Sequence, residues 1–207
     1  MGTINPLTHP LSIVFSAPSH LAVLRALCDS REGMSGRAVS RAAGINHQAC
    51  AVALKKLGGL GLIRRQGAGR VQLVSLNFDH FLVRDLLLPA LRKERELMSA
   101  IRDEIAGKVG KYALAASLFG SVARGTAETG SDLDMLLVVA GSIKRSLADK
   151  ARDFSAEFRN RYGIRLSPIV LSVKEAKTRL EQDDPLILNI LAEGIDLGPK
   201  KLKDILG

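Results

Sequence analysis

The sequence has few aromatic residues and lacks the marks of an exported or membrane-spanning protein. Of its 207 residues only 4% are Phe, Trp or Tyr, and tryptophan is missing altogether. This scarcity argues against binding of single-stranded nucleic acid by base stacking. The longest stretch without Lys, Arg, Asp or Glu, residues 1–24, contains three prolines and has no basic segment before it. We therefore expect neither a secretory signal nor a membrane span.

Cysteine is equally scarce. Cys28 and Cys50 are the two cysteines, each lies in an apolar helical pattern, and neither belongs to a Cys/His cluster with the spacing of metal ligands. A disulfide framework is excluded, and the expected location is the cytoplasm.

Positive charge is concentrated near the N-terminus. The net charge of the chain is +9. Residues 1–78 carry nine Lys and Arg against Asp29 and Glu32, a net charge of +7, which leaves +2 for residues 79–207. Such asymmetry is typical of a nucleic-acid-binding module joined to another domain, although a merely basic surface gives the same count.

The first eighty residues have the pattern of three short helices followed by a hairpin. Apolar spacing predicts helices over residues 19–30, 36–44 and 46–60. Ser19 and Asn46 are the expected N-caps of the first and third, and Gly44 ends the second. Two strands then follow, over residues 63–65 and 70–76, around the turn Gly67-Ala68-Gly69.

The run GRAVSRAAGINHQACAVALKKLGGLGLIRRQGAGRVQLVSLN resembles the winged helix-turn-helix of bacterial and archaeal transcription regulators. The resemblance implies that the third helix enters the major groove of double-stranded DNA, with the wing on the phosphates. The residues it points to are Asn46, His47, Gln48, Lys55, Arg64, Arg65 and Arg70. Many winged helices serve instead as protein-binding or intramolecular modules, and that alternative stays open.

Residues 80–110 are expected to form a connecting helical region. Pro89 should begin or kink a helix, and Gly107 and Gly110 should end it. Its apolar stripe packs on a domain or, alternatively, forms a homodimer contact. The expected domains are therefore residues 1–79, the connection 80–110, and residues 111–207.

A strand, a glycine turn and a helix follow in succession. Residues 112–119 form an uncharged run of strand length that ends at Gly120-Ser121, with a short helix expected from Val122. Backbone N–H groups at such a turn suit an anionic phosphate, and glycine allows a close approach. Arg124 and Thr126 are expected to assist in binding the nucleotide.

Ten residues further on, two carboxylates flank one leucine. Because side chains alternate along a strand, Asp132 and Asp134 should project to one face and Leu133 to the other. Two carboxylates at one point are costly without a cation, and oxygen ligands beside a triphosphate suit Mg²⁺. Taken alone, the pattern also fits an N-cap and a solvated residue.

The Gly-Ser turn, the ten-residue interval and the Asp-x-Asp pair together resemble the DNA polymerase beta-like nucleotidyltransferase superfamily in its minimal form, over residues 112–198. The resemblance implies an α+β fold, a small mixed sheet flanked by helices. It further implies that Gly120 and Ser121 hold the NTP, that Asp132 and Asp134 are catalytic residues ligating two Mg²⁺ ions, and that a nucleoside monophosphate passes to an acceptor hydroxyl. The segment argues against a P-loop NTPase, because Thr126 occupies the position at which the P-loop motif has a lysine.

The sequence departs from the superfamily on a later strand. A third carboxylate is expected there as metal ligand and general base, but residues 164–172 contain no acid. Pro168 should place that strand at a sheet edge or a bulge. The downstream acids, expected to be helix caps or solvated residues, are Asp183, Asp184, Glu193 and Asp196.

Two functions remain in view from the sequence. The first is a Mg²⁺-dependent nucleotidyltransferase, acting on an unknown acceptor and coupled to a DNA-binding winged helix. The second is a non-catalytic DNA-binding regulator or antitoxin-like protein, whose transferase domain senses nucleotide or a protein partner.

Overall fold

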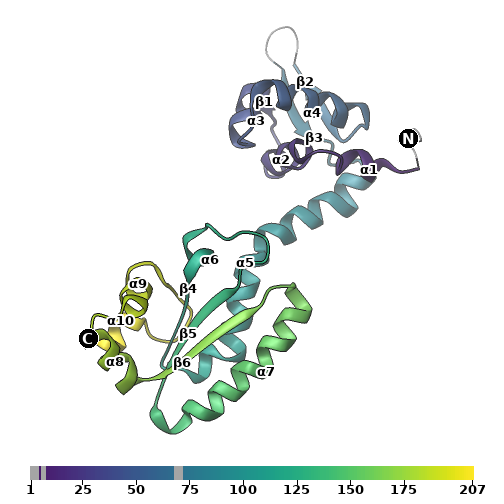
Figure 1. The fold of residues 1–207 in the computed structure, drawn as a ribbon. Helices are drawn as coiled ribbons and strands as arrows, with labels where there is room; N and C mark the ends of the chain where they lie inside the picture. Colours follow the sequence, from purple (N-terminus) through teal and green to yellow (C-terminus); the bar gives the residue numbers. More distant parts are fainter. Residues whose placement is uncertain (1–4, 6–7, 68–71) are drawn as a thin grey trace. The chain divides into compact units, whose positions relative to one another are not determined.

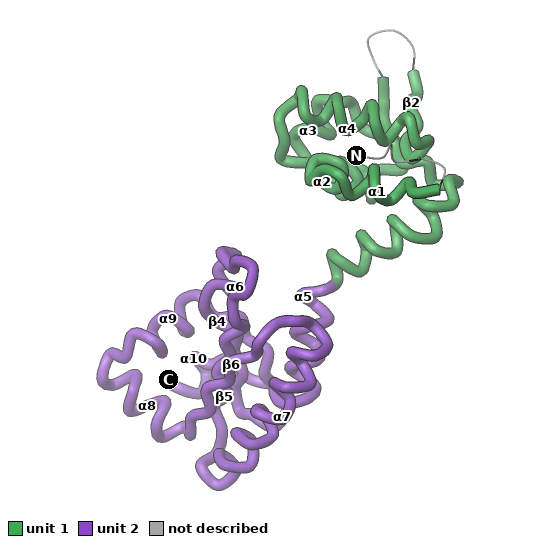
Figure 2. Tube along the Cα trace, turned by 45° about the vertical axis from the view of Figure 1, so that its right-hand side comes forward, with its two compact units in different colours: residues 1–96 green, residues 97–207 purple. Residues whose placement is uncertain are grey.

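The computed structural model describes residue 5, residues 8–67 and residues 72–207. Within them the chain forms two compact units, residues 1–96 and residues 97–207 (Figure 2). In the described part, no helix is both long enough and apolar enough to cross a membrane.

Unit 1 is built from short helices and a small antiparallel sheet. Its helices are α1 (Pro10–Val14), α2 (Pro18–Leu27), α3 (Gly36–Ala42) and α4 (His47–Gly59). Its strands are β1 (Met34–Ser35), β2 (Ile63–Gln66) and β3 (Leu73–Leu76), in the order β1-β3-β2. The predicted turn at Gly67-Ala68-Gly69 and the start of the second predicted strand, including Arg70, lie partly outside the described residues.

Local sequence signals explain where these helices begin. The Asn46 side chain accepts a hydrogen bond from the Ala49 N–H at 2.8 Å, which confirms the predicted cap of α4. The prediction that Ser19 caps the first helix was wrong. Pro18 occupies the first turn of α2, where its fixed φ and missing N–H are tolerated, so the cap position falls on Ala17.

The connection to unit 2 starts with a widened helical turn. Residues Val83–Leu87 (η1) form a π-helix, in which the Leu88 N–H bonds the Val83 carbonyl. The helix α5 (Leu88–Lys108) follows directly. Because Pro89 has no N–H and its ring crowds the preceding turn, the wider turn accommodates it without breaking the helix. Pro89 thus lies at the start of α5, as predicted.

Unit 2 is an α+β structure with one mixed four-stranded sheet (Figure 1). Its strands are β4 (Ala115–Phe119), β5 (Leu133–Val139), β6 (Leu166–Ser172) and β7 (Ile195–Asp196). The order is β6-β5-β4-β7, with β5 and β6 parallel and the other pairs antiparallel. Pro168 therefore lies on an edge strand, as predicted.

Helices cover both faces of this sheet. The remaining elements of unit 2 are η2 (Gly110–Tyr112), α6 (Gly120–Arg124), η3 (Gly141–Ile143), α7 (Lys144–Tyr162), α8 (Val173–Glu181), α9 (Pro185–Glu193) and α10 (Leu202–Leu206). One core joins the sheet to the last part of α5 and to α7, where Phe158 is fully buried. The other joins it to α8, α9 and α10.

Alternation along β5 divides its side chains between these two cores. Leu133, Met135 and Leu137 pack in the core of α5 and α7, whereas Leu136 and Val138 pack in the core of α8, α9 and α10.

The observed starts of two elements differ from the predicted ones. β4 begins at Ala115 because residues Gly110–Tyr112 form a 3-10 turn, and α6 begins at Gly120 instead of Val122.

Candidate active site

The two acids of the Asp-x-Asp pair lie at the start of β5. Leu133, between them, is 1% exposed and belongs to the core, while Asp132 and Asp134 are partly exposed. The expected alternation is therefore present, with the leucine buried and an acid on each side of it.

Gly120 makes room for one of these carboxylates. Phe119 pairs with Asp134 across β4 and β5, so the turn that follows Phe119 comes directly against the Asp134 side chain. Gly120 has φ +77°, and a Cβ at this position would stand 2.5 Å from Asp134 Oδ2. Glycine is thus required here twice, by the left-handed backbone and by the carboxylate.

The carboxylate of Asp134 is held in an environment that disfavours its charge. Burial raises the pKa of Asp134 above its ordinary value, and the neighbouring negative charge of Asp132 raises it further. The Ser167 hydroxyl, which lies next to Asp134 in the parallel register of β5 and β6, and the positive charge of Arg165 lower the pKa of Asp134 and so act in the opposite direction. A cation at this carboxylate would relieve both unfavourable effects.

Asp132 already has a cationic partner. Arg165 precedes β6 and donates from Nε to Asp132 Oδ1 at 2.9 Å and from Nη2 to Oδ2. This paired guanidinium holds the pKa of Asp132 below its ordinary range, and the charge of Arg159 adds to the effect. The two acids therefore have unlike environments.

The other residues predicted to bind nucleotide are near the turn but are engaged within the protein. The side chain of Ser121, at the start of α6, is partly exposed. Arg124 forms an ion pair with Glu193 at 3.5 Å, and the Thr126 hydroxyl donates to the Ser121 carbonyl at 3.4 Å. A direct role for Arg124 would require it to leave Glu193.

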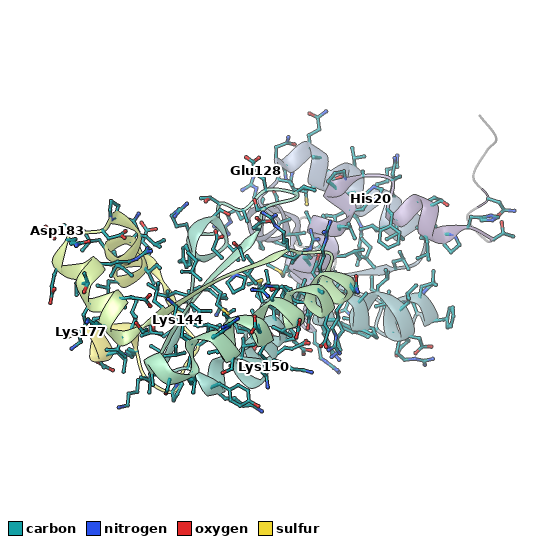
Figure 3. The ribbon with its side chains drawn as sticks, turned by 60° about the horizontal axis from the view of Figure 1, so that its bottom comes forward. His20, Glu128, Lys144, Lys150, Lys177 and Asp183 are labelled. Atoms are coloured by element: carbon teal, nitrogen blue, oxygen red, sulfur yellow. The ribbon has the colours of Figure 1, made fainter. Side chains whose placement is uncertain are left out.

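A cavity of about 580 Å³ opens beside Asp132. Its walls come from α5, α6, the end of α7 and the loop 127–132, which includes Glu128 (Figure 3). Arg159 and Arg165 line it, whereas Asp134 does not. Sequence reasoning missed both arginines, because nothing in their spacing sets them apart from the other basic residues.

The donor set fits a cation that also binds a triphosphate. Among the described residues no group of three or more His, Cys, Asp or Glu could hold a metal by itself. Mg²⁺ is commonly held by one or two carboxylates, with substrate phosphates and water as further ligands. The partly buried Asp134, adjacent to Asp132 and open to the Gly120 turn, provides such a partial set.

The downstream acids do not supply a third carboxylate. Asp184 caps α9 through the Leu186 N–H, and Asp196 accepts from the Ser117 hydroxyl at 2.9 Å and the Leu202 N–H. Glu193 binds Arg124. Asp183, at positive φ, lies in the turn between α8 and α9 (Figure 3). Strand β6 itself presents Ser167 beside Asp134.

Of the residues predicted to bind DNA in unit 1, those that the structure describes lie on α4, at its N-cap and on β2. His47, Gln48 and Lys55 are exposed on α4, while the Asn46 side chain is occupied as the helix cap. Arg64 forms an ion pair with Asp79 at 2.8 Å, and Arg65 donates to Gln72 at 3.4 Å. A hollow of about 720 Å³ is lined by α3, α4 and residues of β1, β2 and β3, with Arg37, His47 and Arg65 among its lining residues. Arg70 lies outside the described residues.

A mixed sheet with helices on both faces, a Gly-Ser turn and two carboxylates on the neighbouring strand together define a nucleotidyltransferase-type domain. Residues 98–194 match the family model described as the nucleotidyltransferase domain. The chain is 37% identical over 105 residues to a putative protein adenylyltransferase of Methanocaldococcus jannaschii, an alignment that covers 47% of this chain and 69% of that protein. The chain belongs to the nucleotidyltransferase family and is a nucleotidyltransferase.

One solved structure is also similar to the chain. It is a crystal structure described as a toxin–antitoxin with AMP-PNP, and it shares 20% sequence identity with this chain at a TM-score of 0.30. The similarity covers 54% of this chain and 77% of the other.

Proposed function

We propose that unit 2 transfers a nucleoside monophosphate from an NTP to an acceptor hydroxyl, with Mg²⁺ bound at the acid pair formed by Asp132 and Asp134. The observation that carries this proposal is the contact of Gly120 with Asp134. It brings the turn suited to phosphate and the carboxylate suited to the cation to one point.

In the proposed step, the acceptor oxygen forms a bond to the α-phosphorus and the bond from that phosphorus to the bridging oxygen breaks. Pyrophosphate leaves, and the hydroxyl proton passes to water. When bound, Mg²⁺ would neutralise phosphate charge as it develops. The chain itself positions the carboxylates through β5 and offers backbone N–H groups at the start of α6, where the first amides of a helix have no intrahelical partner.

The relative suggests which substrates to test first. It is named a putative protein adenylyltransferase, so ATP is the first nucleotide and a protein hydroxyl the first acceptor to examine. In this chain Ser167 stands beside Asp134 where an acid would serve as general base. General-base help commonly contributes about a hundredfold or more, so we expect slow turnover.

The test is transfer of label from α-³²P-labelled NTPs to macromolecules of a cell extract, with Mg²⁺ present and absent. We expect a labelled product with ATP that depends on Mg²⁺ and falls about a thousandfold in Asp134→Asn, because metal stabilisation of transferring phosphate is worth several kcal/mol. Asp149→Asn is the matched control, since Asp149 is an acid on α7 paired with Arg152. No labelling with any NTP, despite nucleotide binding, would favour the non-catalytic sensor instead.

We further propose that unit 1 is a winged helix-turn-helix that binds double-stranded DNA. Its order of helices, the small-residue helix α3 and the capped helix α4 followed by an antiparallel strand pair support this proposal. The exposed His47, Gln48 and Lys55 on α4 are the proposed contacts to bases and phosphates, with Arg64, Arg65 and Arg70 on phosphates. In this interpretation, DNA binding localises the transferase or controls its expression.

A further inference from the structure

The pairing of β5 with β6 places Ser167 of β6, and Arg165 just before it, opposite the two acids. The parallel register of the two strands pairs Leu133 with Leu166 and Asp134 with Ser167, so Arg165 adjoins Asp132. The backbone bond from the Leu133 N–H to the Arg165 carbonyl, at 2.8 Å, fixes this alignment at the start of both strands. The neighbouring strand therefore offers a cation and a hydroxyl, and no acid.

The guanidinium of Arg165 engages both oxygens of Asp132. Nε and Nη2 bind Oδ1 and Oδ2 separately, which is the two-pronged geometry that arginine makes with carboxylates. Its side chain is 67% exposed while that of Asp132 is 29% exposed, so the pair lies at the surface with the acid as its less exposed member. Arginine stays protonated at any relevant pH, so this cation is permanent.

Asp134 feels the charge of Arg165, but among the described residues no cation forms an ion pair with it. It has a hydroxyl from Ser167, the Gly120 turn on its other side, and a burial that disfavours its charge. The two acids are thereby made unequal. Asp132 is neutralised by Arg165, whereas Asp134 requires a cation that binds together with the nucleotide.

We propose that Arg165 takes the place of a second divalent ion, so that this site binds a single Mg²⁺, at Asp134, together with the NTP. The inference rests on the proposed function. Arg165 is a positioning residue in this view. It holds Asp132 in place and adds one fixed positive charge beside the site, where other members of the superfamily use an additional acid and a second ion.

Counting bound Mn²⁺ by electron paramagnetic resonance tests this proposal. The full chain is titrated with Mn²⁺ at saturating α,β-methylene-ATP, which cannot be cleaved at the reacting bond. We expect about one Mn²⁺ per bound analogue and no spin coupling between ions, against about two coupled ions in a two-metal site. Two coupled ions in the wild-type chain would overturn the proposal.

Two double variants separate the effect of Arg165 on the number of bound ions from the effect of a neighbouring arginine. Arg165→Ala with Ser167→Asp removes the cation and restores an acid opposite Asp134, and we expect about two ions per analogue. Arg159→Ala with Ser167→Asp is the matched control, because Arg159 lines the same cavity but does not hydrogen-bond to Asp132. It should keep about one ion. Equal counts in the two variants would overturn the role of Arg165.

Two further measurements test the proposal even if a double variant does not fold. If the double variant does not fold, Arg165→Ala alone is titrated with Mn²⁺ without nucleotide. We expect the affinity of this variant for Mn²⁺ to rise at least about tenfold, because the positive charge of Arg165 no longer competes for Asp132. An unchanged affinity would contradict the proposal.

Calorimetric titration with the analogue distinguishes a failure of the proposed function from a failure of this inference alone. Absence of nucleotide binding would overturn the proposed function, and with it this inference, whereas two ions with normal binding would overturn this inference alone.

Discussion

The two units use opposite charges for the sites proposed in them. Unit 1 carries exposed cations on α4 and β2, in a segment whose first 78 residues have a net charge of +7. Unit 2 places two carboxylates beside a phosphate-binding type of turn, and these need a cation before they can meet a polyanion. This difference in charge predicts how ligand binding by each unit depends on the ions in solution. Binding through unit 1 should weaken with monovalent salt, and binding through unit 2 should depend on a divalent ion.

The largest expected effects come from removing one core side chain of each unit. Phe158 in unit 2 and Leu57 in unit 1 are both fully buried. Phe158→Ala should cost about 3–5 kcal/mol and Leu57→Ala about 2–5 kcal/mol of stability, since each leaves a cavity. We expect Phe158→Ala to weaken nucleotide binding and Leu57→Ala to weaken DNA binding, each with less effect on the other ligand. Chemical unfolding and both binding assays measure this, and equal loss of both ligands in each variant would show that the units do not act separately.

A pair of glycine substitutions sharpens the account of unit 2. Gly120 and Gly125 both have positive φ, +77° and +71°, but only at Gly120 would a Cβ meet another group, Asp134. Each substitution to alanine should cost about 1–2 kcal/mol through the left-handed backbone. Gly120→Ala should also displace the carboxylate and lower transfer about a hundredfold. Labelling rates compared at equal folded fraction test this, and similar rates in the two variants would remove Gly120 from the site.

In unit 1 the prediction concerns salt. Replacing Arg64 and Arg65 by alanine should weaken binding to duplex DNA of any sequence and reduce the slope of log K against log salt by about two, one for each phosphate contact. Fluorescence anisotropy at several salt concentrations gives this slope. Arg152→Ala, on α7 in unit 2, is the control and should leave the slope unchanged. An unaltered slope in the double variant would exclude these arginines as phosphate contacts.

The smallest expected effect is a pH dependence in unit 2. A hydrogen bond with Lys144, followed by bonds from Ser172, lowers the pKa of Glu175 to about 2. Because this folded-state pKa lies below the unfolded value of about 4.3, the group stabilises the fold above that pH. The contribution is lost as pH falls from about 4.3 to about 2. The difference in Tm between wild type and Glu175→Gln should therefore shrink over this range, and a difference that stays constant from about pH 4.3 to about pH 2 would contradict this role of Glu175.

Local signals allowed much of this structure to be predicted. Asn46 as a cap, Pro168 on an edge strand and the burial of Leu133 between two acids follow from backbone geometry within a few residues. The Ser19 cap failed because a neighbouring proline competed for the same turn. The pairing of Arg165 with Asp132 was beyond prediction, since it depends on the register of two strands separated by α7. Periodicity reveals which residues face together on one strand, but it does not reveal which residues of another strand will stand beside them.

Pro168 also affects how readily the edge of the sheet can pair with another strand. At the outer strand of a sheet, unpaired N–H groups offer a template on which a foreign strand can assemble, a common route to aggregation. Strand β6 is an edge strand of the sheet, and the proline at its third residue has no N–H to offer. The strand that places Ser167 beside Asp134 is therefore a poor template for the addition of a foreign strand.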